Sequence, residues 1–306
     1  MKIKKNNRRF EGQLQLFLLA LPGIIWFFIF CYVPMAGSVV AFKNYKPNKG
    51  IWGSKWVGLK NFEFLFSSNS AGRIVRNTLI YNFASIIIVA VVAVCIALLM
   101  NNVKRKFYIK TYQTMLFLPR FISWVVVGYM ALIFFHYEYG VFNNILASLG
   151  FEKISWYQEP SYWWVILIVF NVWKVMGYTS LIYYGAIIGI DESLYESADI
   201  DGANGWTKTW KITIPLIRPT IIIMSLMSIG SIMRADFGLF YYVPNDSGSL
   251  YSTTDVLDTY IYRALKGSGD IAGSAAASFF QSVVGFMMII ISNWIVNKVD
   301  SSSALF

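Results

Sequence analysis

Three cationic side chains lie inside otherwise apolar stretches of the sequence, namely Arg120, Lys174 and Arg234. A cation near the centre of a bilayer costs about 2.5–3.5 kcal/mol, so such residues usually face a bundle interior or a water-filled cavity. Lys174 shares one helical face with Asn171 and Tyr178, beside Trp173. Aromatic rings pack on the C–H faces of a solute, while amide and cationic groups bind its hydroxyls or carboxylates. This grouping predicts a polar, aromatic path through a membrane.

A structural interpretation of the same cations stays open. Arg120 can cap a helix that breaks after Pro119, Lys174 can pair with a carboxylate of another chain, and Arg234 can extend to outer head groups. If instead the stretch around Arg120 is one continuous helix, the Arg120 side chain shares a helical face with three other side chains and is part of the predicted path. Those three are Ser123, Trp124 and Val127.

The sequence does not carry the groups that catalysis needs. His136 is the only histidine, which excludes a two-histidine zinc site, and we expect it to be an interfacial polar residue. Neither a phosphate-binding Gly-x-x-x-x-Gly-Lys-Ser/Thr loop nor a Gly-x-Ser-x-Gly nucleophile motif occurs. We therefore expect no catalytic residue, no metal site and no cofactor in this chain, and any ATPase must be a separate subunit.

Composition indicates an integral membrane protein. Of 306 residues, 57% are hydrophobic and only 14% are charged, whereas soluble domains average roughly 25% charged residues. The net charge of +10 is accounted for by basic loops and lipid head groups rather than by nucleic acid. The predicted fold class is all-α, a polytopic membrane protein with six transmembrane helices.

Six apolar stretches are long enough to cross a bilayer, which takes about 20 residues each. They follow a basic N-terminus at 1–13, which we expect in the cytoplasm together with the C-terminus. Basic residues number 13 on the expected inner side and 10 on the expected outer side, a small bias, although the short loop 101–112 is much richer in them than 137–160. The expected spans are 14–42, 77–100, 113–136, 161–188, 214–236 and 276–297.

A polar stretch at 191–219 connects the expected spans 161–188 and 214–236 and overlaps the start of the second. It has the sequence signals of a helix, a tight turn and a second helix. Asp191 and Ser193 can cap the first helix. Gly202 can adopt the positive φ that ends it, with Asp201 beside it in the turn. The second helix runs through Trp206 and Trp210, and Pro215 and Pro219 mark the return to the membrane. Such a knob suits docking into a groove of another protein.

This stretch resembles the cytoplasmic coupling loop, or EAA loop, of ABC importer permeases. Two positions depart from the family pattern, Ser197 in place of Ala and Ile214 in place of Leu; a polar loop that matches by chance is the alternative. The matching residues are Glu196, Ala198, Asp201, Gly202, Ala203, Trp210, Ile212, Pro215 and Pro219.

Three further segments are similar to the carbohydrate-uptake branch of these permeases, especially to importers of polysaccharide-derived oligosaccharides. They are Val57-Gly58-Leu59-Lys60-Asn61-Phe62, Asn77-Thr78 and the run 118–126. The resemblance implies the type I importer fold, with residues 14–306 as the permease domain. It also implies a second permease subunit, two cytoplasmic ATPase subunits that bind ATP and Mg, and an extracellular solute-binding protein.

The implied mechanism is alternating access driven through the coupling loop. Glu196 would make polar contacts in the ATPase groove, Gly202 would form the turn, and Trp206 and Trp210 would pack the knob. Three cations facing few acids hint at an acidic, uronate-containing sugar. A secondary active transporter of a small polar solute remains the alternative, although few acids lie in the spans to bind a coupling ion.

Overall fold

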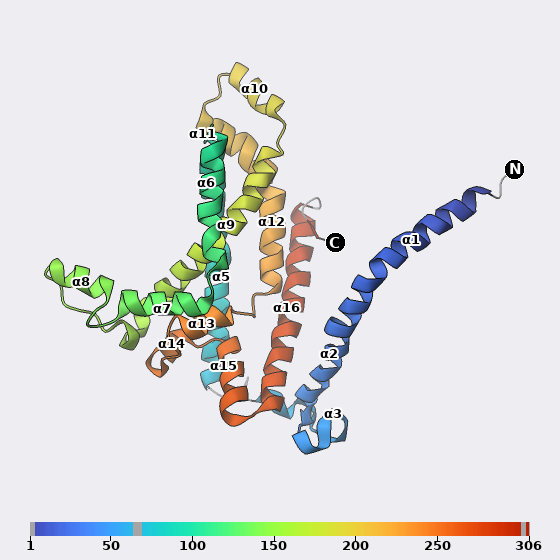
Figure 1. Ribbon diagram of the computed structural model, residues 1–306, viewed down its shortest axis with the longest axis vertical. Coiled ribbons are helices and arrows are strands. Elements are labelled where there is room, and N and C mark those ends of the chain that lie inside the picture. Colours follow the sequence, from blue (N-terminus) through green and yellow to red (C-terminus); the bar gives the residue numbers. More distant parts are fainter. Residues whose placement is uncertain (1–3, 64–68, 301–303, 306) are drawn as a thin grey trace. The chain divides into compact units, whose positions relative to one another are not determined.

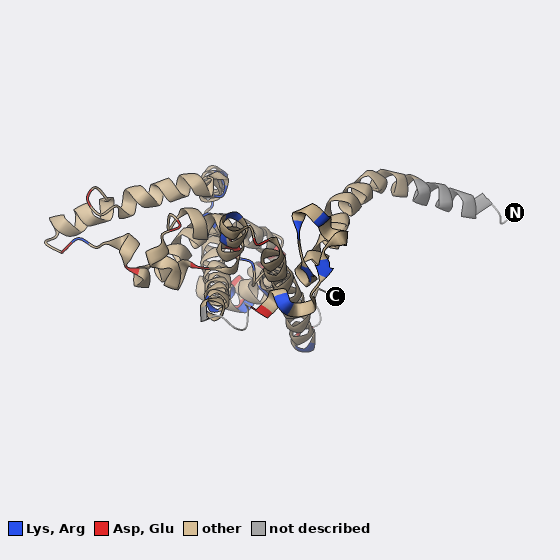
Figure 2. Ribbon diagram, turned by 90° about the horizontal axis from the view of Figure 1, so that it is seen from below, with Lys and Arg blue, Asp and Glu red and all other residues tan. Residues whose placement is uncertain are grey.

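The computed structural model describes residues 4–63, 69–300 and 304–305. Residues 1–3 of the expected basic N-terminus lie outside this part. The chain divides into two compact units, one of residues 1–64 and 264–279, the other of residues 65–263 and 280–306. Nearly all described residues are helical, and charged residues are sparse along the long helices (Figures 1 and 2). This agrees with the all-α prediction.

The first unit begins with a long apolar helix and ends in short turns. A two-residue antiparallel pair joins Lys43 to Trp56. Asn61 donates from its amide to the carbonyls of Ala41 and Lys43, both at 2.9 Å, which explains an asparagine in the 57–62 motif. The elements are α1 Lys4–Phe27, a π turn Phe28–Tyr32, α2 Val33–Met35, a 3-10 helix Ala36–Phe42, β1 Lys43–Asn44, a 3-10 turn Pro47–Lys49, α3 Gly50–Gly53, β2 Lys55–Trp56, a 3-10 helix Gly58–Phe62, a π turn Ala264–Ser268 and the start of α16 Ile271–Val299.

The second unit contains the other long helices and the polar connections between them (Figure 1). Its helices are α5 Asn69–Asn101, α6 Lys106–Phe117, α7 Trp124–Phe135, α8 Val141–Ser148, α9 Trp163–Ile188, α10 Glu192–Ile200, α11 Gly205–Lys208, α12 Ile214–Gly230, α13 Phe237–Tyr242, α14 Tyr251–Thr254 and α15 Leu257–Arg263. Short 3-10 turns cover Leu118–Phe121, Trp156–Gln158, Pro160–Tyr162 and Gly248–Leu250, and a π turn covers Thr209–Thr213.

Five described helices are long and apolar enough to span a membrane, and a bent pair can supply a sixth. The expected third span, 113–136, is not one helix, because 106–121 and 124–135 meet at 94°. Pro119 lies in a 3-10 turn at this break, where its ring cannot continue an α-helix. The single helical face predicted for Arg120, Ser123, Trp124 and Val127 is therefore wrong.

The expected fifth span is also wrong at its C-terminal end. Helix α12 stops at Gly230, so Arg234 lies in the connection to α13 rather than in a membrane helix. Two other spans begin earlier than expected, at residues 70 and 271.

Packing of α5 against α9 forms the centre of the second unit. Ala93 and Ala97 of α5 lie fully buried with Tyr183 and Ile187 of α9 and Ile217 of α12. Small side chains let membrane helices approach closely and gain dispersion contacts.

The Asn77-Thr78 motif ties the start of α5 to the segment before α15. The Asn77 amide donates to the carbonyls of Ser252 and Asp255, at 3.2 and 3.1 Å, and Leu257 N–H donates to the Thr78 hydroxyl at 3.0 Å. Burial raises the pKa of the Asp255 carboxyl, and its ion pair with Arg263 opposes that rise. A buried anion with such a partner holds the segment in one geometry.

Helix α9 crosses α6 at a glycine. A methyl group built on Gly177 would overlap the backbone carbonyl of Leu116, whereas one on Gly185 of the same helix meets nothing within 4 Å. We expect Gly177→Ala to destabilise the protein by about 1–3 kcal/mol through overpacking. Gly185→Ala should be neutral or stabilising by up to about 1 kcal/mol, because alanine favours helix. Thermal unfolding in detergent micelles measures both, and equal midpoints would contradict the close crossing.

Candidate functional site

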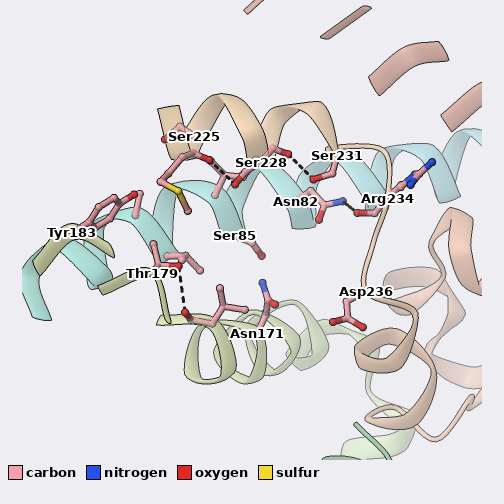
Figure 3. A pocket seen from close by; sticks show the side chains of 15 residues that line it. Asn82, Ser85, Asn171, Thr179, Tyr183, Ser225, Ser228, Ser231, Arg234 and Asp236 are labelled. Carbon is pink, nitrogen blue, oxygen red and sulfur yellow. Dashed lines mark hydrogen bonds between the residues drawn. The ribbon is translucent and has the colours of Figure 1, made fainter. Parts of the chain in front are cut away.

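A polar cavity of about 290 Å³ lies among α5, α9, α12 and the connection that follows α12. Figure 3 shows its polar side chains around the open space, with the Arg234 guanidinium directed away from it. Of the residues predicted for the path, Asn171 and Arg234 line this cavity. The other polar lining residues were not predicted: Asn82, Ser85, Thr179, Tyr183, Ser225, Ser228, Ser231 and Asp236.

Several hydroxyls of the cavity donate to carbonyls of their own chain segment. Ser225 donates to the Ile221 carbonyl at 2.8 Å and Ser228 to the Met224 carbonyl at 2.9 Å. This back-bonding satisfies the hydroxyl proton inside an apolar helix. The oxygen lone pairs remain able to accept hydrogen bonds from a solute. The cavity is therefore suited to a solute rich in hydroxyl donors.

Arg234 and Asp236 place one positive and one negative charge at this cavity. The Arg234 guanidinium donates to the Ser282 hydroxyl at 3.3 Å, and its backbone carbonyl accepts from the Asn82 amide at 3.2 Å. Asp236 accepts from Trp124 Nε1 at 2.7 Å and from Gly238 N–H at 3.0 Å, which caps α13. Trp124, predicted for the path, is thus a donor to the carboxylate rather than part of the cavity lining.

Lys174 holds the break between α6 and α7. Its Nζ donates to the carbonyl of Ile122, the residue that directly follows the 3-10 turn. The same Nζ lies 4.3 Å from the ring centre of Trp124. Ser123 caps α7 by accepting from Val126 N–H at 3.3 Å. A carbonyl freed by a break needs a partner in a membrane, and Lys174 supplies it.

The other cation of this region has an aromatic partner. The Arg120 guanidinium lies 4.7 Å from the ring centre of Tyr178, a cation–π contact. Trp173 packs against an apolar cluster that includes Trp163 and Val127. The structure thus joins Arg120 with Tyr178 and Lys174 with Trp124, and none of these four residues lines the cavity itself.

The stretch 191–219 folds as the sequence predicts. Asp191 caps α10 by accepting from Ser193 N–H at 3.0 Å, and this hydrogen bond lowers the pKa of its carboxyl. Gly202 has φ +74°. Ala203 N–H donates to the Ala198 carbonyl at 2.9 Å and Gly202 N–H to the Asp199 carbonyl at 3.1 Å. This is the Schellman arrangement that ends a helix with a left-handed residue.

Two side-chain contacts close this loop on itself. Lys208 of α11 pairs with Asp199 of α10 at 2.6 Å, and the Tyr195 hydroxyl meets the Thr213 hydroxyl at 2.9 Å. Asn204 caps α11 by accepting from Thr207 N–H at 2.8 Å. The two short helices therefore form one folded knob.

The knob presents apolar groups to its surroundings. Ile200 is 87% exposed, Trp206 73% and Trp210 53%, and the two tryptophan rings lie 5.6 Å apart. Glu196 and Asp201 are also exposed, while Ala198 and Ala203 are half-buried at the turn. Exposed apolar groups gathered on a polar loop mark a surface for a protein partner.

Comparison with known proteins identifies the family. Residues 93–301 match the model of the binding-protein-dependent transport system inner membrane component. The chain belongs to this family. It is a multi-pass membrane permease.

Two proteins of Bacillus subtilis are similar over most of their length. Protein LplB is 34% identical over 93% of this chain and 89% of its own. The polygalacturonan/rhamnogalacturonan transport system permease YteP is 33% identical over 94% of this chain and 88% of its own.

Solved structures of a bacterial importer are similar in fold. One is a transporter involved in import of the acidic polysaccharide alginate, with a TM-score of 0.84 and 33% identity over 97% of this chain and 99% of that one. A second, also with a TM-score of 0.84 and 33% identity, covers 98% of each chain and is in complex with an alginate pentasaccharide-bound periplasmic protein.

The contacts of Lys174 predict a structural role for this side chain, which can be tested against a role in binding the solute. We expect Lys174→Met to destabilise the permease by about 1–3 kcal/mol, because a hydrogen bond from a charged group is lost and the Ile122 carbonyl is left unpaired. Lys153 also donates to a carbonyl, that of Glu138 at 3.3 Å, but on the surface. Lys153→Met should change stability by no more than about 0.5 kcal/mol.

Thermal unfolding and transport, measured on the same preparations, separate the two roles of Lys174. A lower unfolding midpoint supports the structural role. A loss of transport with unchanged thermal stability would assign the side chain to the solute instead.

Proposed function

We propose that this chain is the membrane-spanning permease subunit of an ATP-driven importer of oligosaccharides, with uronate-containing oligosaccharides as its substrates. The observation that carries the proposal is the cavity among α5, α9 and α12, whose lining is rich in hydroxyl and amide groups. Sugars offer many hydroxyl donors and acceptors to such groups. The path proposed here is this cavity, with Asn171 and Arg234 among its binding groups.

Charge and similarity together favour an acidic sugar. Arg234 is the cation of the cavity lining, and a guanidinium can bind a carboxylate through two parallel hydrogen bonds. Asp236, on the same lining, already accepts from Trp124 and Gly238. The similar proteins named above for polygalacturonan/rhamnogalacturonan and for alginate transport concern acidic polysaccharides. A uronate in the cavity would bind Arg234 after its guanidinium turns from Ser282 toward the cavity.

The energy source is proposed to be a separate pair of cytoplasmic ATPase subunits, which bind ATP and Mg. The chain has no phosphate-binding loop of its own. The exposed Ile200, Trp206 and Trp210 supply the apolar contact for an ATPase groove, and Glu196 supplies a charge beside it. The loop 191–219 is then cytoplasmic, and so are both termini and the basic residues 1–13.

A second permease subunit and an extracellular solute-binding protein complete the proposed assembly. The family is named for its dependence on binding proteins, and a similar importer is in complex with one. In this scheme residues 14–306 are the permease domain. ATP binding moves the loop, and the helices around the cavity turn it from the inner to the outer side.

The substrate is tested with the reconstituted importer. We expect uronate-containing oligosaccharides, each with its binding protein, to stimulate ATP hydrolysis, and Arg234→Gln to weaken that response about tenfold in apparent affinity by loss of a charge-assisted hydrogen bond. Arg120→Gln is the matched control, because its guanidinium lies over Tyr178 and not in the cavity lining. Stimulation by neutral sugars alone would overturn the acidic substrate and leave the importer intact.

The same preparation tests the energy source. Uptake that persists after the ATPase subunits lose hydrolysis would favour the secondary transporter.

The turn at Gly202 tests the docking loop. Gly202 and Gly205 both have open space at the position of a methyl group, but only Gly202 has positive φ. An alanine at Gly202 costs about 1–2 kcal/mol in the left-handed conformation, so we expect Gly202→Ala to reduce uptake and ATPase co-purification by up to about tenfold. Gly205→Ala should leave both unchanged. Equal behaviour of the two variants would contradict a docking role for this turn.

A further inference from the structure

A second cavity lies between the C-terminal end of α5 and the C-terminal half of α6. Its volume is about 320 Å³, and it shares no residue with the polar cavity. Aliphatic side chains and one tyrosine form the walls: Ile96, Leu99, Met100 and Val103 from α5 and the following turn, and Tyr112, Met115 and Leu116 from α6. Nothing in the transport scheme above uses this cavity.

The apolar cavity opens to the surface of the chain. Leu99 is 68% exposed and Met115 is 66% exposed. Both belong to helices that are long or apolar enough to cross a membrane. Apolar side chains at such a position meet lipid, unless another protein covers them. The cavity is thus an open apolar groove rather than a closed void.

A run of basic residues begins where the groove ends. Val103 lines the groove, and Lys104, Arg105 and Lys106 follow it directly. None of the three takes part in a salt bridge in the part of the chain that the structure describes. Arg105 precedes α6 and leaves its first N–H groups without a side-chain cap. Cations and free N–H groups together favour an anion at this end.

One stripe of α6 connects the basic end to the apolar end. Arg105, Tyr108, Tyr112 and Met115 follow each other at intervals of three or four residues, which places them on one face. The rings of Tyr108 and Tyr112 stack at 6.4 Å between the charge and the methionine. Tyrosine prefers the level between head groups and acyl chains. Along this stripe the side chains change from a cation to tyrosines and then to methionine, in the same order as the head groups, interface and acyl chains of one leaflet.

We propose that this groove is a binding site for one anionic phospholipid. The acyl chain lies between α5 and α6, and the phosphate binds Lys104, Arg105 and the first N–H groups of α6. A zwitterionic lipid such as phosphatidylcholine has the phosphate but also a quaternary ammonium that the three cations repel, and a small soluble anion would not use the groove. Only a ligand with both parts is complementary to the whole site. Clusters of basic residues beside membrane helices attract anionic head groups.

The test uses the purified permease with the subunits that co-purify with it. The probe is phosphatidylglycerol with a photoreactive diazirine on its acyl chain, and the matched phosphatidylcholine probe serves as comparison. After irradiation, peptide mass spectrometry locates the label. We expect phosphatidylglycerol to label residues 96–103 and 112–116 several times more strongly than phosphatidylcholine does.

Variants separate the site from general surface charge. Lys104→Gln with Arg105→Gln should reduce labelling about tenfold, and Met115→Trp should do so with the charges intact by filling the groove. Lys110→Gln is the control, because Lys110 lies two residues from both Tyr108 and Tyr112 and so faces away from the stripe. It should leave labelling unchanged.

Three results would overturn the proposal. They are equal labelling by both probes, labelling that survives Met115→Trp, and a loss with Lys110→Gln as large as with the double variant. Cross-links from this groove to another subunit in place of lipid would also overturn it, and would assign the groove to a protein interface.

Discussion

The second unit depends on one constraint of the membrane, that every backbone carbonyl released by a helix break needs a donor from the protein itself. Side chains of two long helices, α5 and α9, provide the donors. Each reaches a carbonyl in a segment where the chain is not helical or changes direction. The contacts run from Lys174 to Ile122, from Asn82 to Ile232 and Arg234, and from Asn77 to Ser252 and Asp255. The straight helices therefore hold the bent segments, and the bent segments shape the cavity.

Local patterns were enough to predict most of the membrane helices and the fold of the loop 191–219. Hydropathy indicates a span independently of the helices packed around it. The helix before Gly202 has to end in a tight turn, and this predicts the left-handed conformation that Gly202 adopts. The break at residues 118–123 was predicted only as the alternative, a helix that breaks after Pro119, because the run 113–136 is mostly apolar and hydropathy does not distinguish one long helix from two that meet at an angle. Pro119 was the one local sign of it.

The candidate site could be predicted only in part, because the prediction relied on charged side chains, and two of the three cations do not line the cavity. Lys174 and Arg120 are the conspicuous side chains, yet one binds a carbonyl and the other an aromatic ring. Seven of the fifteen residues that line the cavity are serine, threonine or asparagine, which appear unremarkable inside an apolar helix. Their convergence depends on how α5, α9 and α12 pack, and that follows from distant pairs such as Ala93 with Ile217, which no local pattern contains.

The π turn Thr209–Thr213 passes into α12 without a gap. Trp210, on the exposed knob, and Ser228, on the cavity, thus belong to one continuous helical rod, about 27 Å apart at 1.5 Å per residue. A rod of that length acts as a lever arm. Tilting it by about 5° at the knob moves the far end by about 2 Å, enough to break or form a hydrogen bond across the cavity. Force applied outside the membrane can therefore change the width of the cavity by a change of angle, with no residue of the rod leaving its helix.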